Sequence, residues 1–400
     1  MAAEGQKPES EQVIAAPAAI IETAPADVPE RRSAIARKAG SLRYAVAFVA
    51  ATLAGLFATS VANKAYAPEM YATGGMLPAA NAHAKGLNYA VFDLNLNIRA
   101  LRDAQLARMT KTPDIIIIGA SHWQESHKEL LKGRDIFNAH IHRDYWEDLL
   151  GMVELLVKHD KLPHKLIFSI RDKQFTPVDA RKDYLWEPGI PAYRAMAKRL
   201  GLEPESYLKT APYDRARALI SLPMLFENVT RWHNALEHPH ATDETHFQSL
   251  DVLLPDGSIL WSQDHKNIFT PERARREANK FAEAAINDPP KIDAKGVAAF
   301  GKVLDFLQQK GVKVYFVQPP FNPVFYDRVQ DTDYMKGLNR LDDLTRRIAA
   351  ERGIPVFGSF NPHEVGCTAD EYIDAEHSNP KCLQHVWDQF IALEAREGQH

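Results

Sequence analysis

The chain has 400 residues, 45% of them hydrophobic and 25% charged, which is enough for one large or two ordinary globular domains. Its formal net charge of −4 is small for this length. Nothing indicates the strongly basic surface that binds nucleic acids, so we expect no nucleic-acid partner.

The N-terminal part differs from the rest. Residues 1–30 are rich in Ala, Pro and Glu without an aromatic side chain, and we expect residues 1–43 to form a disordered cytoplasmic tail. Residues 44–63, YAVAFVAATLAGLFATSVAN, carry no charge and have the length of a transmembrane helix. The positive-inside tendency then places the remaining chain outside the cytoplasm, because a basic cluster precedes the helix: Arg31, Arg32, Arg37, Lys38 and Arg43.

Two other interpretations of residues 44–63 stay open. The following KAYA, residues 64–67, has the small-x-small form of a signal-peptidase site, so the segment could be a cleaved signal peptide. It could also be a buried helix of a wholly cytoplasmic protein. We favour a single-pass inner-membrane anchor with the larger domain in the periplasm or outside the cell.

After a Pro, Gly and Ala-rich linker at 64–94, the pattern predicts one α/β domain over 95–400. A helix at 95–109 leads into the strand IIII at 115–118, and a helix is expected to begin at 122. Further strands are expected at 135–141, 164–170, 312–320 and 354–360, and further helices at 145–159, 294–311 and 338–353. This alternation predicts a doubly wound, mostly parallel, three-layer sheet of the flavodoxin-like kind.

An insertion at about 177–290 interrupts this alternation. We expect it to be largely helical and to act as a lid or substrate-facing subdomain. Helices are predicted at 211–238 and at 271–285, the second capped by Thr270, with a polar turn at 254–262. Histidines gather at 233–246, but their spacing matches no standard metal site and Pro239 interrupts them, so we interpret this stretch as a solvated loop.

Ser121 stands where a buried strand ends and the chain turns through Gly119 and Ala120. Ligands of open α/β sheets collect at this carboxyl edge, which suits a nucleophile. The same position equally suits a helix N-cap serine, so the turn alone leaves both roles open.

A second motif favours catalysis. Asp374 and His377 form an Asp-x-x-His pair in DAEH, after the last predicted strand and therefore at the same sheet edge. The carboxylate could hold one imidazole nitrogen while the other takes the proton of Ser121, as in a Ser-His-Asp triad. A histidine hydrogen-bonded only to the loop backbone is the structural alternative.

IIIIGAS, DAEH and the order of elements between them resemble the SGNH or GDSL-like hydrolases over residues 95–395. The resemblance is to their membrane-tethered branches, which include the accessory proteins of alginate O-acetylation and of lipoteichoic acid D-alanylation. It implies a serine acyl esterase or O-acyltransferase acting on a cell-envelope or secreted polysaccharide. The implied partners are an acylated carbohydrate or acyl donor, the inner membrane and a membrane-bound acyltransferase; no metal or organic cofactor is implied.

The oxyanion hole departs from the family pattern. The family's second block supplies a glycine and its third a Gly-x-Asn, whereas this chain has FNAHIHRDYW and FSIRDKQF. Asn138 or Arg171, with backbone N–H groups near Ser121, could stabilise an oxyanion instead. Arg171 could equally pair with Asp172. A non-catalytic binding or scaffold protein of a polysaccharide assembly complex is therefore the alternative function.

Three expectations remain. His122 follows the serine and is expected to point away from it, toward substrate or solvent. Gln318 ends a predicted strand and could line the pocket, although a structural turn is the simpler interpretation. Cys367 and Cys382, the only cysteines, could form a disulfide in an oxidising compartment or remain two free thiols.

Overall fold

The computed structural model describes residues 29–66, 76–91, 98–142, 144–177, 189–204 and 240–397, together with three isolated positions between 204 and 240. The chain divides into two compact units, Met1–Phe57 and Ala58–His400. The predicted helix at 211–238 lies outside the described residues except at those isolated positions.

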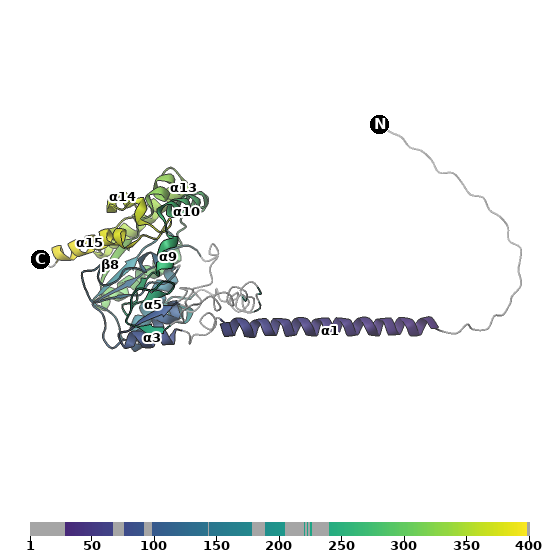
Figure 1. The fold of residues 1–400 in the computed structure, drawn as a ribbon. Helices are drawn as coiled ribbons and strands as arrows, with labels where there is room; N and C mark the ends of the chain where they lie inside the picture. Colours follow the sequence, from purple (N-terminus) through teal and green to yellow (C-terminus); the bar gives the residue numbers. More distant parts are fainter. Residues whose placement is uncertain are drawn as a thin grey trace, which may run out of the picture. The chain divides into compact units, whose positions relative to one another are not determined.

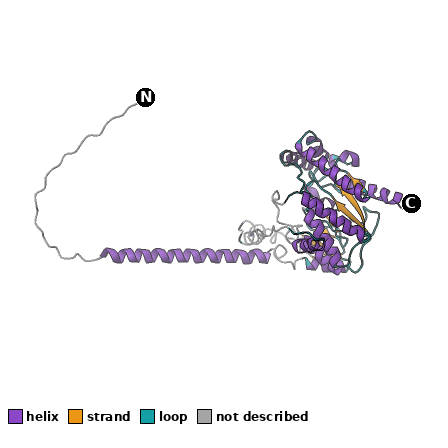
Figure 2. Ribbon diagram, turned by 180° about the vertical axis from the view of Figure 1, so that it is seen from behind, coloured by secondary structure: helices purple, strands orange, loops and turns teal. Residues whose placement is uncertain are grey.

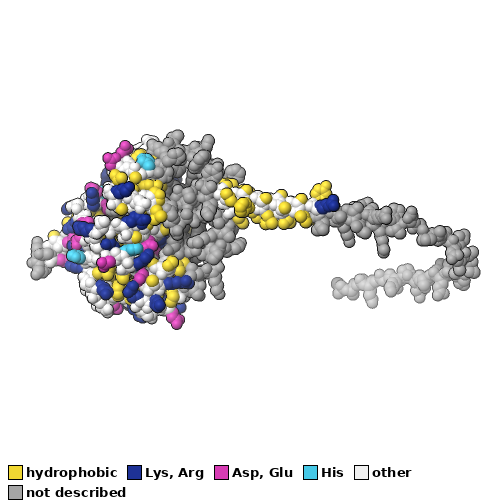
Figure 3. All heavy atoms as spheres, turned by 90° about the horizontal axis from the view of Figure 1, so that it is seen from below, with side chains coloured by type: hydrophobic (Ala, Val, Ile, Leu, Met, Phe, Trp, Pro, Cys, Tyr) yellow, Lys and Arg dark blue, Asp and Glu magenta, His cyan; other side chains and the backbone are white. Residues whose placement is uncertain are grey.

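Helix α1 (Pro29–Tyr66) contains the predicted apolar span. The segment Arg43–Ala62 has a mean hydropathy of 2.0, only 6% of it is buried, and apolar side chains cover it in Figure 3. The helix is long and apolar enough to cross a membrane, and a signal sequence has the same properties. Residues 29–43 are helical rather than disordered, because a proline opens the helix and Ala, Arg, Glu and Lys favour its continuation.

A five-stranded sheet of parallel strands forms the centre of the second unit (Figures 1 and 2). The strand order is β3-β2-β4-β8-β9, so the direction of winding reverses between β2 and β4, where ligands of doubly wound sheets collect. The strands are β2 (Ile115–Ile118), β3 (Ile136–Asn138), β4 (Lys165–Ser169), β8 (Lys313–Gln318) and β9 (Val356–Gly358).

Both faces of this sheet are buried, which explains the unbroken run of isoleucines in β2. Ile116 and Ile118 pack in one core and Ile115 and Ile117 in the other. The first core includes side chains of α4 (Ile98–Arg108), α5 (Trp146–Lys158), α11 (Ala294–Gln309) and α13 (Asp333–Arg352). The second is covered by α15 (Pro380–Glu397), so the domain has the three predicted layers.

A second, antiparallel sheet was not expected. Its order is β5-β1-β6-β7, built from β1 (Asn88–Val91), β5 (His240–Thr242), β6 (Asp251–Leu253) and β7 (Ile259–Leu260). The predicted linker at 64–94 therefore contains structured elements, α3 (Leu77–Ala84) and β1. Short strands whose partners lie far along the chain leave little periodicity in the sequence, so this part of the prediction was wrong.

The described part of the insertion also contains helices α6 (Ile190–Arg199), α9 (Gln263–Ile268) and α10 (Pro271–Ala285). The predicted cap of α10 is confirmed, since Thr270 Oγ1 accepts a hydrogen bond from Arg273 N at 3.3 Å. The predicted polar turn at 254–262 joins β6 to β7 and reaches the turn that carries Ser121.

Candidate active site

Ser121 begins a single 3₁₀ turn, Ser121–Trp123, and two residues separate it from the end of β2. The α-helix expected from residue 122 does not form; buried side chains such as Trp123 instead hold the chain in successive turns. Gly119 is required by close packing, because a Cβ there would lie 2.4 Å from Ser169 Cβ on β4. The Ser121 side chain caps no helix, and its hydroxyl is directed to another residue.

That residue is His377, 256 positions along the chain. Ser121 Oγ lies 2.8 Å from His377 Nε2, and His377 Nδ1 lies 2.8 Å from Asp374 Oδ2. The backbone N–H groups of Glu376 and His377 donate to Asp374 Oδ1, each at 2.8 Å, and fix the carboxylate. The three predicted side chains thus form a continuous Ser-His-Asp hydrogen-bond chain.

Asp374 and His377 each stabilise the charged form of the other. Burial opposes protonation of His377, but the charge and hydrogen bond of Asp374, followed by Glu376 and Glu125, raise its pKa to about 9. Burial likewise disfavours the Asp374 carboxylate, yet His377 and the two backbone N–H groups hold its pKa well below the usual range. The resting site therefore holds an imidazolium–carboxylate pair near neutral pH.

Two carboxyl groups beside the triad were not expected from the sequence, the buried Glu125 and the half-buried Glu376. Glu125 is 6% exposed, and burial raises its pKa to about 8. Burial and the charge of Asp172 raise the pKa of Glu376 to about 7. The available signal was position alone: Glu125 follows Ser121 by four residues and Glu376 lies inside the DAEH motif.

Asn138 is not free to stabilise an oxyanion. Its side-chain Nδ2 donates to the carbonyl oxygens of Trp123 at 2.6 Å and Ser126 at 3.2 Å, and its backbone N–H donates to Asp256 O at 2.6 Å. The residue is fully buried, because it ties the end of β3 to the catalytic turn. The structure thus gives Asn138 a structural role and corrects its expected place as a donor.

Arg171 is engaged mainly with Asp144. Its Nε bonds Asp144 Oδ1 at 2.8 Å and its Nη2 bonds Asp144 O at 2.6 Å, in a buried ion pair. Asp172 lies 3.8 Å from Arg171 Nη1, so the expected Arg171–Asp172 pairing is secondary to Asp144. Asp172 Oδ2 accepts instead from the Tyr334 hydroxyl at 2.7 Å.

The remaining two candidate residues are Gln318, for which a structural role was the simpler interpretation, and His122. Gln318 donates to Asp342 Oδ1 at 2.6 Å on α13, so its side chain serves helix packing rather than the site around Ser121. His122 is 6% exposed and its ring stacks on His377, with centroids 5.4 Å apart. Of the two expected surroundings, substrate or solvent, exposure of His122 to solvent was therefore wrong.

The insertion supports the catalytic turn. Ile259 N donates to Gln124 O at 2.7 Å, and Lys128 N donates to Asp256 Oδ2 at 3.1 Å. Gly257 adopts φ +83°, and a Cβ there would lie 2.3 Å from Asn138 O. This described part of the insertion therefore acts as a brace beneath the nucleophile, whereas the sequence suggested a lid.

A disulfide closes the loop that carries the other two triad residues. Cys367 and Cys382 are bonded, as the sequence allowed, and they bracket Asp374 and His377. Within the loop, Tyr372 and Ser378 form an antiparallel bridge. The bond thus tethers the loop that carries Asp374 and His377 to the start of α15.

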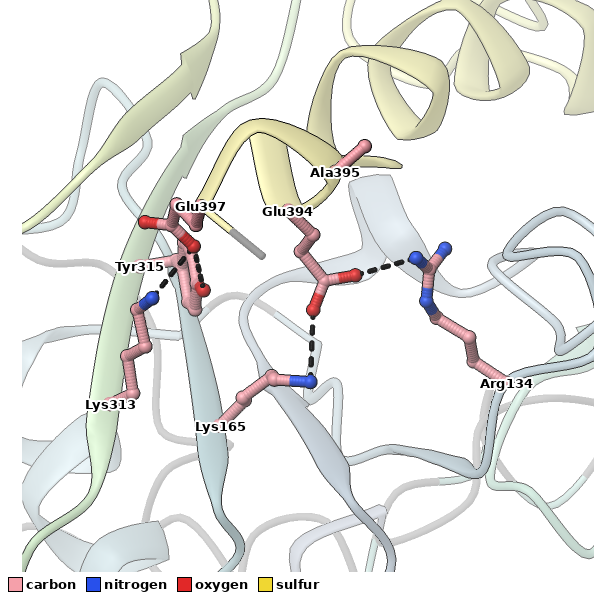
Figure 4. Close-up of a pocket in the computed structure, with 7 residues that line it drawn as sticks. All are labelled: Arg134, Lys165, Lys313, Tyr315, Glu394, Ala395 and Glu397. Atoms are coloured by element: carbon pink, nitrogen blue, oxygen red, sulfur yellow. Dashed lines mark hydrogen bonds and ion pairs between the residues drawn. The ribbon is translucent and has the colours of Figure 1, made fainter. Parts of the chain in front are cut away.

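Two other regions, the histidine-rich stretch at 233–246 and a hollow at the other edge of the sheet, contain no comparable arrangement of side chains in the part of the chain that the structure describes. Among the described residues no group of three or more His, Cys, Asp or Glu side chains could hold a metal ion; His233 and His238 lie outside them. A hollow of about 430 Å³ lies at the start of β4 and β8, at the edge opposite Ser121 (Figure 4). Its cations are neutralised there: Lys165 and Arg134 pair with Glu394, and Lys313 pairs with Glu397.

Comparison with known proteins adds no identification, because no family model and no curated protein matches this chain.

Proposed function

We propose that the protein is a membrane-anchored serine acyl esterase or O-acyltransferase that acts on a cell-envelope or secreted polysaccharide. One observation carries the proposal: Ser121, His377 and Asp374 form a hydrogen-bond chain at the carboxyl edge of the sheet, next to the β2–β4 reversal. The resemblance of IIIIGAS and DAEH to the SGNH hydrolases supports the reaction class and the substrate class.

The reaction follows from the positions of the three side chains. Ser121 Oγ attacks the acyl carbonyl carbon while its proton passes to His377 Nε2, and the carbonyl π electrons move onto the oxygen. Collapse of this intermediate expels the alcohol, which takes the proton from His377, and leaves an acyl-serine. Water or a sugar hydroxyl then accepts the acyl group in the reverse sequence, giving hydrolysis or transfer.

The protonation state of His377 sets the working pH. Since Nε2 must be unprotonated to accept the serine proton and the pKa is about 9 in the free protein, activity should rise with pH toward that value. Asp374, fixed by two backbone N–H groups, keeps Nδ1 protonated and the ring oriented. The triad therefore becomes active as the imidazolium loses its proton.

We also place the domain outside the cytoplasm, anchored in the inner membrane by α1. The apolar span Arg43–Ala62 and the preceding basic residues support this orientation. The Cys367–Cys382 bond supports it independently, because disulfides persist in oxidising compartments. A membrane-bound acyltransferase on the same side could supply the acyl group.

The alternative of a non-catalytic binding or scaffold protein gains from the hydrogen bonds that engage the Asn138 amide and the Nε and Nη2 groups of Arg171. A fluorophosphonate probe separates the two functions, because it reacts only with an activated serine. We expect the wild-type protein to be labelled, Ser121→Ala to remain unlabelled, and Ser126→Ala, a change at a buried serine close by in the sequence, to remain labelled. Folded wild-type protein that neither reacts nor releases acetate from p-nitrophenyl acetate would reject the enzyme.

A further inference from the structure

His122 is the nearest sequence neighbour of the nucleophile and also packs on the general base. Its ring centroid lies 5.4 Å from that of His377 with 23° between the planes. The side chain is 6% exposed, although Ser121 and His377 beside it are partly open to solvent. The imidazole thus forms a sheltered wall of the reaction site.

Both nitrogens of this ring are buried without a hydrogen-bond partner among the described residues. Such a group costs about 1–3 kcal/mol for each unmet polar atom, whereas phenylalanine would stack in the same place without that cost. Buried polar atoms left unpaired in a native structure call for a functional explanation. A partner that arrives with the substrate would supply one.

The charges facing His122 keep it neutral. Burial, together with the positive charges of His377 and Arg171, holds its pKa well below 6.5, and only Asp374 acts in the opposite direction. A neutral imidazole has one N–H donor and one acceptor nitrogen. A neutral histidine can polarise a carbonyl without giving up its proton, as the electrophilic histidine of triosephosphate isomerase does.

The other side-chain donors expected near Ser121 have partners: the Asn138 amide bonds the catalytic turn, and Arg171 bonds Asp144 through Nε and Nη2. We propose that the ring N–H of His122 donates a hydrogen bond to the acyl oxygen as Ser121 attacks, so that His122 is an oxyanion donor. This assignment rests on the proposed acyl-transfer function. In the step, the new Ser121 Oγ–C bond forms, the carbonyl π pair moves to oxygen, and the serine proton goes to His377; His122 keeps its own proton throughout.

His122→Phe is the decisive variant, because it keeps a flat ring against His377 and removes both nitrogens. Relative to the wild type, kcat for p-nitrophenyl acetate should fall by roughly 10²–10³-fold, the usual loss when one oxyanion donor is removed, with KM little changed. His122→Gln, which retains an N–H donor, should recover part of this loss. Binding of phenylboronic acid, which becomes tetrahedral on the serine, should weaken in parallel.

Thermal unfolding at or above the wild-type temperature establishes that the fold of each variant is intact, and His122→Phe should unfold above it because no unpaired nitrogen remains. A His122→Phe protein that keeps the wild-type kcat and boronate affinity would overturn the donor role while leaving the triad untouched. A loss in His122→Phe that His122→Gln does not relieve at all would overturn it too, because the N–H would then be irrelevant. Absence of turnover and probe labelling in the wild type would instead reject the proposed function itself.

Discussion

Asp374→Asn tests the triad by changing which nitrogen of His377 carries the proton. The asparagine Oδ1 can still accept the N–H groups of Glu376 and His377, so the loop should keep its conformation. Its amide NH₂, however, would face His377 Nδ1 and favour the tautomer with the proton on Nε2. That nitrogen could then no longer accept the proton of Ser121.

Asp374→Asn should change both the pKa of His377 and the tautomer of its ring, and each change affects the rate. The rise of the His377 pKa from 6.5 to about 9 corresponds to roughly 3 kcal/mol of preference for the imidazolium, and Asp374 is the main cause of the rise. Without that charge the pKa should fall to 6.5 or below, because burial remains. The wrong tautomer should in addition lower kcat by about 10⁴-fold.

The assay is the pH dependence of kcat/KM for p-nitrophenyl acetate between pH 5 and 10, corrected for spontaneous hydrolysis. The wild-type rate should rise to a midpoint near pH 9, and the residual rate of Asp374→Asn should reach its plateau at least two pH units lower. A variant that keeps a tenth of the wild-type kcat, or a midpoint still near 9, would refute the assigned role of Asp374.

Three further changes test the surroundings of the triad. Glu125→Gln should leave the stability of the domain nearly unchanged at pH 5 and raise it at pH 9. Folding raises the pKa of the Glu125 carboxyl from 4.5 to about 8, so in the wild type this group increasingly destabilises the folded state as the pH rises above 4.5. A melting temperature equal to that of the wild type at both pH values would contradict this. Gly257→Ala should destabilise the domain by more than the roughly 1–2 kcal/mol of a left-handed non-glycine residue, because the new Cβ would meet Asn138 O at 2.3 Å; urea unfolding measures it, with Gly133→Ala, also at positive φ but in open space, as control. Cys367→Ser with Cys382→Ser should lose about 3 kcal/mol for the loop between them and lower kcat more than KM changes, because the loop carries His377; unchanged unfolding by urea would count against this.

The features that could be predicted from the sequence are those with a strong local pattern. The isoleucines of β2, buried on both faces, and the amphipathic helices α5 and α11 appear within one or two residues of their expected bounds. Ser121, Asp374 and His377 were found because each follows a strand at the same sheet edge, and parallel strands bring such positions together. The expected strand order therefore allowed Ser121 and His377 to be paired although 256 residues separate them.

The features that could not be predicted depend on which acceptor each polar side chain bonds in the folded protein. Asn138 and Arg171 stand where donors were expected, but the carbonyl of Trp123 and the carboxylate of Asp144 compete for their N–H groups. A single sequence reveals the donor and not its acceptor. The antiparallel sheet escaped for a related reason, because strands of two to four residues have too few alternations to show a period.

These hydrogen bonds also explain why the surroundings of Ser121 differ from the SGNH pattern that IIIIGAS and DAEH resemble. No regular helix follows Ser121, so the catalytic turn needs support from elsewhere, and the Asn138 amide and the brace around Gly257 provide it. Once Asn138 is committed to holding the turn, it cannot also serve the substrate. The donor must then come from the turn itself, and His122, neutral and unpaired beside His377, is the side chain that the turn places there.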